Sequence, residues 1–224
     1  MGTLYIVATP IGNLQDISAR AISTLKAVDG IYCEDTRVTR ILLDQYGISQ
    51  PLFTYHQHSG AGVTKAIMQK LADGGSLALV SDAGTPGIND PGGRLIAELI
   101  RTIPDLQVVP IPGPNAAIAA LSASGFPADR YRYWGFVPLK KGRRTFFAEL
   151  AACGETVVCY ESKHRIVKTL QTLAEMMPER PMLLARELTK KFETLYRGTA
   201  PQVLSALQND TILGEFVIVM GPHA

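Results

Sequence analysis

The sequence is poor in cysteine and has no marked excess of charge of either sign. Only three cysteines occur among 224 residues, at no spacing typical of a zinc site. This excludes a disulfide framework and predicts that Cys33, Cys153 and Cys159 are small buried apolar residues in a reducing compartment. The formal net charge of +2 neither requires nor excludes a nucleic-acid partner, because a local basic patch fits within a balanced total.

The sequence also lacks a long unbroken apolar segment. An uncharged stretch runs from Leu106 to Ala128, but Pro110, Pro112 and Pro114 interrupt it, which excludes a membrane-spanning helix there. The opening MGTLYIVATPIGN has neither the basic region nor the cleavage site of a signal peptide. We therefore expect a cytoplasmic protein with no membrane partner.

Two common nucleotide-binding fingerprints, GxxxxGK[ST] and GxGxxG, are absent from the chain. Instead, turn residues gather in SDAGTPGINDPGG, residues 81–93, directly after an apolar run that is typical of a strand. Glycine allows tight turns and close approach of a ligand to the backbone, and successive N–H groups at a strand exit can bind polar or anionic atoms. From these residues alone, a structural turn and a ligand-binding loop are both open interpretations.

Apolar runs alternate with helical patterns in the first half of the chain. This alternation predicts a mostly parallel sheet with helices on both faces. The expected strands are residues 4–8, 30–33, 52–55, 77–80 and 106–109, with helices between them. Ligands of such sheets bind outside the carboxyl ends of the strands. We therefore expect the strand exits to converge on one cleft; they are Thr9–Asn13, Glu34–Arg37, His56–His58 and Ser81–Gly87.

The character of the sequence changes near Pro112. The second half is richer in β-prone runs and in basic residues, with expected strands at 131–136, 156–160, 182–185 and 216–220. We therefore predict an α/β chain with two domains, residues 1–112 and 113–224. Aromatic residues alternate along 131–136, so we expect their rings in the core rather than on the surface.

Seven short motifs follow one another over nearly the full length: TPIGNL, EDTR, SDAGTPGINDPG, PGPNAA, GF-P-K, YES-HR and RELTK. Together they make the chain resemble the tetrapyrrole-methylase superfamily of S-adenosylmethionine-dependent enzymes. Within it, they are similar to the motifs of members that methylate the ribose 2′-hydroxyl of a cytidine in the decoding region of 16S rRNA. The resemblance implies two α/β domains with S-adenosyl-L-methionine in the cleft between them, a homodimer, and 16S rRNA or the 30S subunit as partner.

The resemblance also implies which residues line the cofactor. The turn at Asp82 matches the superfamily's cofactor loop, which contacts the ligand largely through its backbone. The expected set is Pro10, Ser81, Asp82, Ala83, Thr85, Asn115, Ala116, Tyr160, Leu184 and Glu215. Relatives often continue into a further C-terminal helical segment, and a chain without it is expected to bind RNA weakly if that segment aids binding.

Transfer of a methyl group to a ribose hydroxyl needs a general base or close in-line positioning, because the hydroxyl pKa is far above neutral. The candidate bases are Glu34, Asp35, Asp90, Glu161 and Glu187, and we favour a carboxylate of the EDTR motif. Arg37 beside it is expected to anchor a phosphate, since its planar fork matches phosphate oxygens. The alternative is a helix-capping carboxylate with an internal arginine partner.

Basic residues in the second half are the candidates for binding RNA. Lys140, Lys141, Arg143 and Arg144 form a short basic run after aromatic residues, a combination that suits single-stranded RNA. His164, Arg186 and Lys190 are further substrate-binding candidates, and Glu161 with His164 and Arg165 equally fits an internal network. A solvated surface is the alternative for the basic run.

Two rival functions remain open at this point: a methyltransferase acting on a tetrapyrrole, and a non-enzymatic, cofactor-dependent RNA-binding factor. The EDTR motif, the basic run and RELTK favour a polyanionic substrate over a macrocycle. No metal site is expected, because His56 and His58 lack a third ligand and a sulfonium methyl donor needs no metal.

Overall fold

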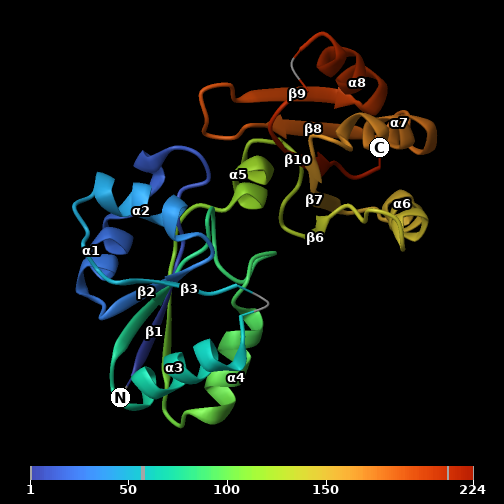
Figure 1. Cartoon of the computed structure of the whole chain (residues 1–224). Helices are drawn as coiled ribbons and strands as arrows, with labels where there is room; N and C mark the ends of the chain where they lie inside the picture. The colour runs from blue at the N-terminus through green and yellow to red at the C-terminus, as the bar shows by residue number, and fades with distance from the viewer. Residues whose placement is uncertain (1, 57–58, 211, 224) are drawn as a thin grey trace. The chain divides into compact units, whose positions relative to one another are not determined.

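The computed structural model describes residues 2–56, 59–210 and 212–223, and it divides into two compact units (Figure 1). Unit 1 is Met1–Asn115 and unit 2 is Ala116–Ala224, whereas the boundary expected from the sequence falls after Pro112. Each unit has its own five-stranded sheet and its own helices, which confirms the α/β class. No helix in the described parts of the chain is long and apolar enough to span a bilayer.

The sheet of unit 1 is entirely parallel, as predicted from its apolar strands. Its strands lie in the order β3-β2-β4-β1-β5. They are β1 (Thr3–Val7), β2 (Gly30–Cys33), β3 (Leu52–Thr54), β4 (Ser76–Leu79) and β5 (Gln107–Ile111). The N-terminal strand β1 is therefore placed between two strands that come late in the unit.

Helices cover both faces of this sheet. One face packs against α1 (Ala19–Ala27) and α2 (Thr36–Gln45), through residues such as Leu25 and Leu43. The other face packs against α3 (Ala61–Ala72) and α4 (Gly93–Thr102), with Leu71 and Leu99 in its core. A 3-10 turn, η1 (Leu14–Asp16), precedes α1. The side chain of Ser18 caps α1 by accepting from the Ala21 N–H.

The sheet of unit 2 is mixed, and its strand order is β6-β7-β10-β8-β9. Strands β6 and β7 pair in parallel, and the remaining neighbours pair antiparallel. The strands are β6 (Tyr131–Phe136), β7 (Thr156–Ser162), β8 (Pro181–Arg186), β9 (Thr194–Thr199) and β10 (Glu215–Met220). The sequence analysis did not predict β9, which lies at the edge of the sheet and is only half-buried.

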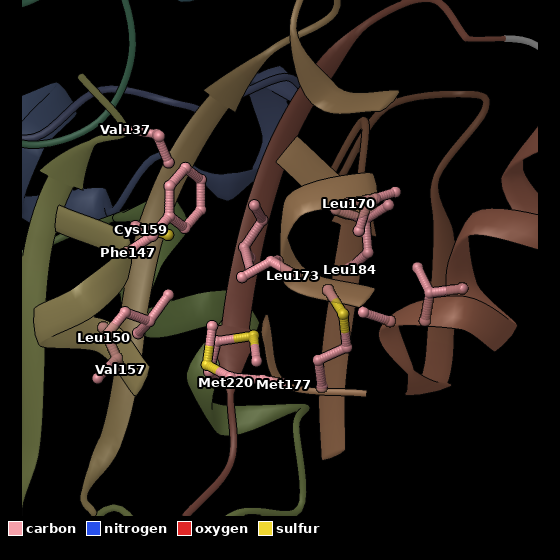
Figure 2. Close-up of a cluster of buried hydrophobic side chains, with 14 of the residues drawn as sticks. Val137, Phe147, Leu150, Val157, Cys159, Leu170, Leu173, Met177, Leu184 and Met220 are labelled. Atoms are coloured by element: carbon pink, nitrogen blue, oxygen red, sulfur yellow. The ribbon is translucent and has the colours of Figure 1, made fainter. Parts of the chain in front are cut away.

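The two faces of this second sheet are covered unequally. The three helices α6 (Arg143–Ala152), α7 (Ile166–Met176) and α8 (Ala200–Gln208) enclose a large core on one face, part of which Figure 2 shows. The short helix α5 (Ala116–Ser122) packs on the other face, over β7 and β10. All three cysteines of the chain are free and buried, as predicted.

One irregularity interrupts the pairing of β6 with β7. Tyr133 pairs with Val158 and Phe136 pairs with Tyr160, so three steps along β6 match two steps along β7. The extra residue forms a bulge in which Gly135 has a φ of 63°. An L residue pays a steric penalty in that backbone conformation, which glycine does not.

Candidate functional site

The exits of β1 and β4 are joined by backbone pairing. Thr9 and Gly84 form an isolated β-bridge, in which the Thr9 N–H donates to the Gly84 oxygen at 2.8 Å and the Gly84 N–H donates back at 3.1 Å. The Thr9 hydroxyl also donates to the Ser81 carbonyl at 3.0 Å. The first turn after β4 is therefore held against the first turn after β1, where Pro10 is buried.

The rest of the glycine-rich loop is fixed by its own side chains. The Thr85 hydroxyl donates to the Pro114 carbonyl at 3.1 Å, and the Ser81 hydroxyl donates to the carbonyls of Ala83 and Gly84. The loop ends at Gly92, with a φ of 139°, where an added Cβ would lie 2.9 Å from the Leu79 side chain. With these hydroxyls turned inward, Asp82 and Ala83 are the exposed residues of the first turn of the loop.

Three carboxylates gather at this loop: Glu34, which follows β2, and Asp82 and Asp90 of the loop itself. The Asp35 N–H, at the exit of β2, donates to Asp82 Oδ1 at 3.0 Å. Burial, and then the charge of Asp82, raise the pKa of Glu34, while the Asp82 N–H and the charge of His56 oppose that rise. Burial, and then the charge of Glu34, raise the pKa of Asp90 to about 6. The exits of β2 and β4 thus converge as predicted. Of the predicted exit His56–His58, Gln57 and His58 lie outside the described residues.

Asp35 and Arg37 of the EDTR motif bind each other. The Asp35 carboxylate caps α2 by accepting from the Arg37 N–H at 2.8 Å and also pairs with the Arg37 guanidinium. The hydrogen bonds from Arg37 lower the pKa of Asp35 to about 2. The structure therefore has the capping arrangement named above as the alternative for this pair. The Arg37 side chain remains 88% exposed, so its face toward solvent is open to a phosphate.

Glu161 lies at the end of β7 and is fully buried in unit 2. Its carboxylate pairs with Arg165 at 2.8 Å and with Arg143 at 3.6 Å, and it accepts from the Thr169 hydroxyl at 2.6 Å. The Ser162 N–H donates to it as well. A carboxylate with these partners fixes the surrounding chain and has no free lone pair facing solvent, as in the internal network named above as the alternative.

The predicted substrate-binding residues fall into two groups. Lys140, Lys141, Arg144 and His164 are exposed. Arg143 donates to Pro138 O and Thr169 Oγ1 besides its pairing with Glu161. Arg186, 6% exposed, donates to Leu213 O and Asp210, and Lys190 Nζ donates to Glu187 at 3.0 Å and Glu215 at 2.9 Å. The cationic groups of Arg143, Arg186 and Lys190 thus have internal partners.

The cofactor residues predicted in the second half are placed on different faces of their sheet. The Tyr160 hydroxyl accepts from the Ala117 N–H at 3.1 Å, so it lies at the start of α5, next to Asn115 and Ala116 in the chain. Leu184 is buried on the opposite face, in the core below α7 (Figure 2). Glu215 is exposed and paired with Lys190. A ligand on the α5 face meets Tyr160 but not the side chain of Leu184.

Sequence reasoning ranked Asp90 below the EDTR carboxylates, although its environment is the more unusual. The sequence signal was weak, because Asn, Asp, Pro and Gly in NDPG are typical of any turn. Among the described residues, no group of histidine, cysteine or carboxylate side chains is arranged to hold a metal ion.

A family model described as Tetrapyrrole (Corrin/Porphyrin) Methylases matches residues 3–204. The chain is 46% identical to Ribosomal RNA small subunit methyltransferase I of Mesorhizobium japonicum, an alignment that covers 98% of the chain and 75% of that protein. The proteins of the same name from Escherichia coli O157:H7 and Bacillus subtilis are 46% and 44% identical, over 99% and 98% of the chain and 78% and 75% of their own lengths.

Solved structures share the fold at much lower identity. Diphthine synthase superposes with a TM-score of 0.74 at 12% identity, covering 99% of this chain and 91% of its own. Cobalt precorrin-4 methyltransferase gives 0.72 at 17% identity, covering 98% and 94%. Uroporphyrin-III C-methyltransferase from Thermus thermophilus, in complex with S-adenosyl homocysteine, gives 0.65 at 17% identity, covering 98% and 97%.

Proposed function

Because the chain belongs to the tetrapyrrole-methylase family, we propose that it is an S-adenosylmethionine-dependent methyltransferase whose substrate is the small-subunit ribosomal RNA. The target is the ribose 2′-hydroxyl of a cytidine in 16S rRNA, and the enzyme works as a cytoplasmic homodimer. The observation that carries this proposal is the likeness, over nearly the whole chain, to relatives named for that RNA. The solved tetrapyrrole methyltransferases support the fold alone.

The glycine-rich loop of unit 1 fits a compact zwitterionic cofactor. Its hydroxyls are bonded back to the loop or to Pro114, so the backbone around Asp82 and Ala83 is held in shape before a ligand arrives. An ordered loop loses little further entropy on binding. When bound, S-adenosylmethionine supplies a methyl group on a positively charged sulfur, which is a strong electrophile. Pro10, Ser81, Asp82, Ala83 and Thr85 are the residues of this unit that would hold it.

The carboxylates beside the loop are suited to take the proton of the ribose hydroxyl. A general base is most effective when its pKa is near the working pH, which favours Asp90, at about 6, over Asp35, at about 2. Glu34 lies beside Asp90 and raises its affinity for a proton through charge repulsion. We assign the proton to the Glu34–Asp90 pair, and to Asp90 first.

The RNA is held by exposed cationic groups. Lys140, Lys141, Arg144 and His164 are exposed in unit 2, and the face of Arg37 toward solvent is exposed in unit 1. Phosphate contacts of this kind release counterions, so methylation of RNA falls steeply as salt rises. Transfer to a small macrocycle, which the resemblance leaves as a rival, would fall much less.

The deciding experiment uses tritium-labelled S-adenosylmethionine and 30S subunits from cells that lack the endogenous activity. We expect label on one cytidine of 16S rRNA, located by nuclease mapping, with the ribose 2′-O-methyl identified after complete hydrolysis. Naked 16S rRNA and a uroporphyrinogen are assayed in parallel. Label on the macrocycle alone, or cofactor binding by calorimetry with no label on any RNA, would overturn the proposal.

A further inference from the structure

Phe136 is an exposed ring in a strand whose aromatic residues were expected in the core. Its side chain is 55% exposed, although it ends β6 and is followed by the fully buried Val137. Trp134, two residues earlier, packs into the core below α6, where its ring meets Phe146 at 5.2 Å. The expectation that these rings are buried is therefore wrong for Phe136 and for Tyr131, which is 39% exposed.

The bulge at Gly135 is what turns this ring outward. In a regular strand, residues two apart share a face, so Phe136 would point into the same core as Trp134. The extra residue reverses the alternation: Trp134 and Val137 face that core, while Tyr133 and Phe136 face the α5 side. Bulges are frequent next to functional sites, where they redirect a side chain. A glycine with positive φ makes this bulge inexpensive.

The redirected ring has a rigid support. Phe136 meets the Tyr160 ring edge-on, with centroids 5.3 Å apart, and the Tyr160 hydroxyl accepts from the Ala117 N–H. Tyr133 contacts the same ring edge-on, with centroids 5.5 Å apart. An edge-to-face contact favours one orientation of the ring, and Phe136 stays 55% exposed in it. Phe136 is thus supported by the residue that the resemblance assigns to the cofactor.

The segment after Phe136 carries exposed cationic groups and is anchored by two arginines that turn inward. Leu139 is 74% exposed, and Lys140, Lys141 and Arg144 follow it at the surface. Arg143 turns inward, where its guanidinium meets Glu161, Thr169 and the Pro138 carbonyl. Arg165 holds the start of the segment by donating to Val137 O at 2.8 Å. The inward arginines fix the segment so that the outward cations keep their places.

We propose that Phe136 is a stacking platform for one unpaired base of the RNA, and that Lys140, Lys141 and Arg144 bind the phosphates next to it. The proposal rests on the proposed function, whose substrate class it sharpens to a single-stranded segment. An exposed aromatic ring followed in the chain by an exposed basic segment matches a single strand, whose bases are unstacked, better than a duplex, whose base faces are covered. If Phe136 instead made a contact between two copies of the chain, Lys140 and Lys141 of both copies would come close together, which charge repulsion opposes.

The test measures binding of a fluorescein-labelled oligocytidine at low salt by anisotropy. We expect Phe136→Leu to weaken binding about tenfold or more, and Phe136→Trp to restore it, because stacking needs a ring face. Tyr131→Leu is the matched control, since Tyr131 is an exposed ring at the other end of the same strand. Binding of a duplex of the same length should change little in Phe136→Leu.

Two further readouts separate this inference from the proposed function. Calorimetry with S-adenosylmethionine should give the same Kd for Phe136→Leu and the unaltered chain, since the ring serves the RNA; a loss confined to cofactor binding would overturn the inference. Sedimentation should show the same assembly state, and dissociation in Phe136→Leu would instead assign the ring to an interface between copies. Equal oligocytidine affinity, within about twofold, also overturns the inference. Ring-dependent RNA binding without methyl transfer to 30S would leave it standing and overturn the proposed function.

Discussion

Two strands of this chain end at a carboxylate, and the surroundings of the two carboxylates differ in sign. Glu34, after β2, has Asp82 and Asp90 as neighbours and only His56 as a cation among the groups that shift its pKa or that of Asp90. Glu161, at the end of β7, has two arginines, a hydroxyl and a backbone N–H. In the first cluster, the like charges of Glu34, Asp82 and Asp90 repel one another. In the second, cations and hydrogen-bond donors surround the Glu161 carboxylate. A structural role accounts for the second arrangement, whereas carboxylates that gather at strand exits with raised pKa values are typical of a functional site.

The largest effect on stability that we expect comes from breaking the second cluster. Glu161→Gln leaves Arg143 and Arg165 without their charge partner in a buried network, so unit 2 should lose about 3 kcal/mol of stability. Trp134 is the single tryptophan of the chain and packs in the core of unit 2, so its fluorescence in urea measures that unit. Glu175→Gln, at an exposed position of α7, is the control. A loss under about 1 kcal/mol would show that the network is dispensable.

The first cluster should be broken with little structural damage and a large loss of activity. We expect Asp90→Asn to lower kcat about 10²- to 10⁴-fold, because the amide cannot accept the proton. Asp35→Asn is the matched control, since asparagine caps a helix as well as aspartate does. The readout is tritium transfer to 30S subunits at saturating cofactor. Equal losses in both variants would return the proton to the EDTR motif.

The pH dependence of kcat sharpens the same point. With the pKa of Asp90 raised to about 6, the base is ionised above that pH and protonated below it. We expect kcat to fall about tenfold for each pH unit below about 6, and to level off above it. Asp90→Asn should remove this dependence. If Asp35 were the base, kcat would fall only near pH 2, the pKa of Asp35. The profile would then be flat over the range in which the protein can be assayed.

The smallest effect we expect is on stability: Asp90→Asn should stabilise the protein, whereas Glu161→Gln should destabilise it. The pKa of Asp90 is higher in the folded chain than its ordinary 3.8, so the folded state binds a proton more tightly than the unfolded state. That contribution to stability is complete below pH 3.8 and is lost as the pH rises through about 6.

At neutral pH, Asp90→Asn should therefore stabilise unit 1, by about 1 kcal/mol after allowance for solvent screening of a half-buried group. Hydrogen exchange of peptides from β2 and β4 measures the gain. A destabilised variant would mean that the hydrogen bond of Asp90 with the Ser81 side chain, which favours the charged carboxylate, outweighs burial and charge repulsion.

Much of unit 1 could be predicted from the sequence because its strands are buried on both faces and read as continuous apolar runs. The meeting of Glu34 with the loop at Asp82 followed from the same argument, since parallel strands end at one edge. The edge strand β9 was missed because TLYRGT mixes polar and apolar residues and has no apolar run. Local patterns predict elements best where burial is symmetrical.

The remaining differences come from contacts between residues distant in the chain. Arg143 is indistinguishable from Lys140 and Arg144 in a basic run, and its inward turn depends on Glu161, which belongs to another strand. Likewise, alternation places Phe136 in the core until the pairing with β7 adds a residue at Gly135. A ranking of candidate bases also required the pKa values, which depend on which carboxylates are brought together.

The position of β1 between β4 and β5 also sets the order in which the nascent chain can acquire structure. Leu4 and Ile6, buried in the finished sheet, have no neighbouring strand until residues 76–79 and 107–111 have been synthesised. At ribosomal rates of about 5–20 residues per second, the first strand emerges many seconds before its last partner. During that interval it is an apolar segment with unpaired edges. Such a segment is a suitable ligand for a chaperone that binds nascent chains. A protein proposed to modify the ribosome thus has, during its own synthesis on a ribosome, a first strand that can aggregate before its partner strands are made.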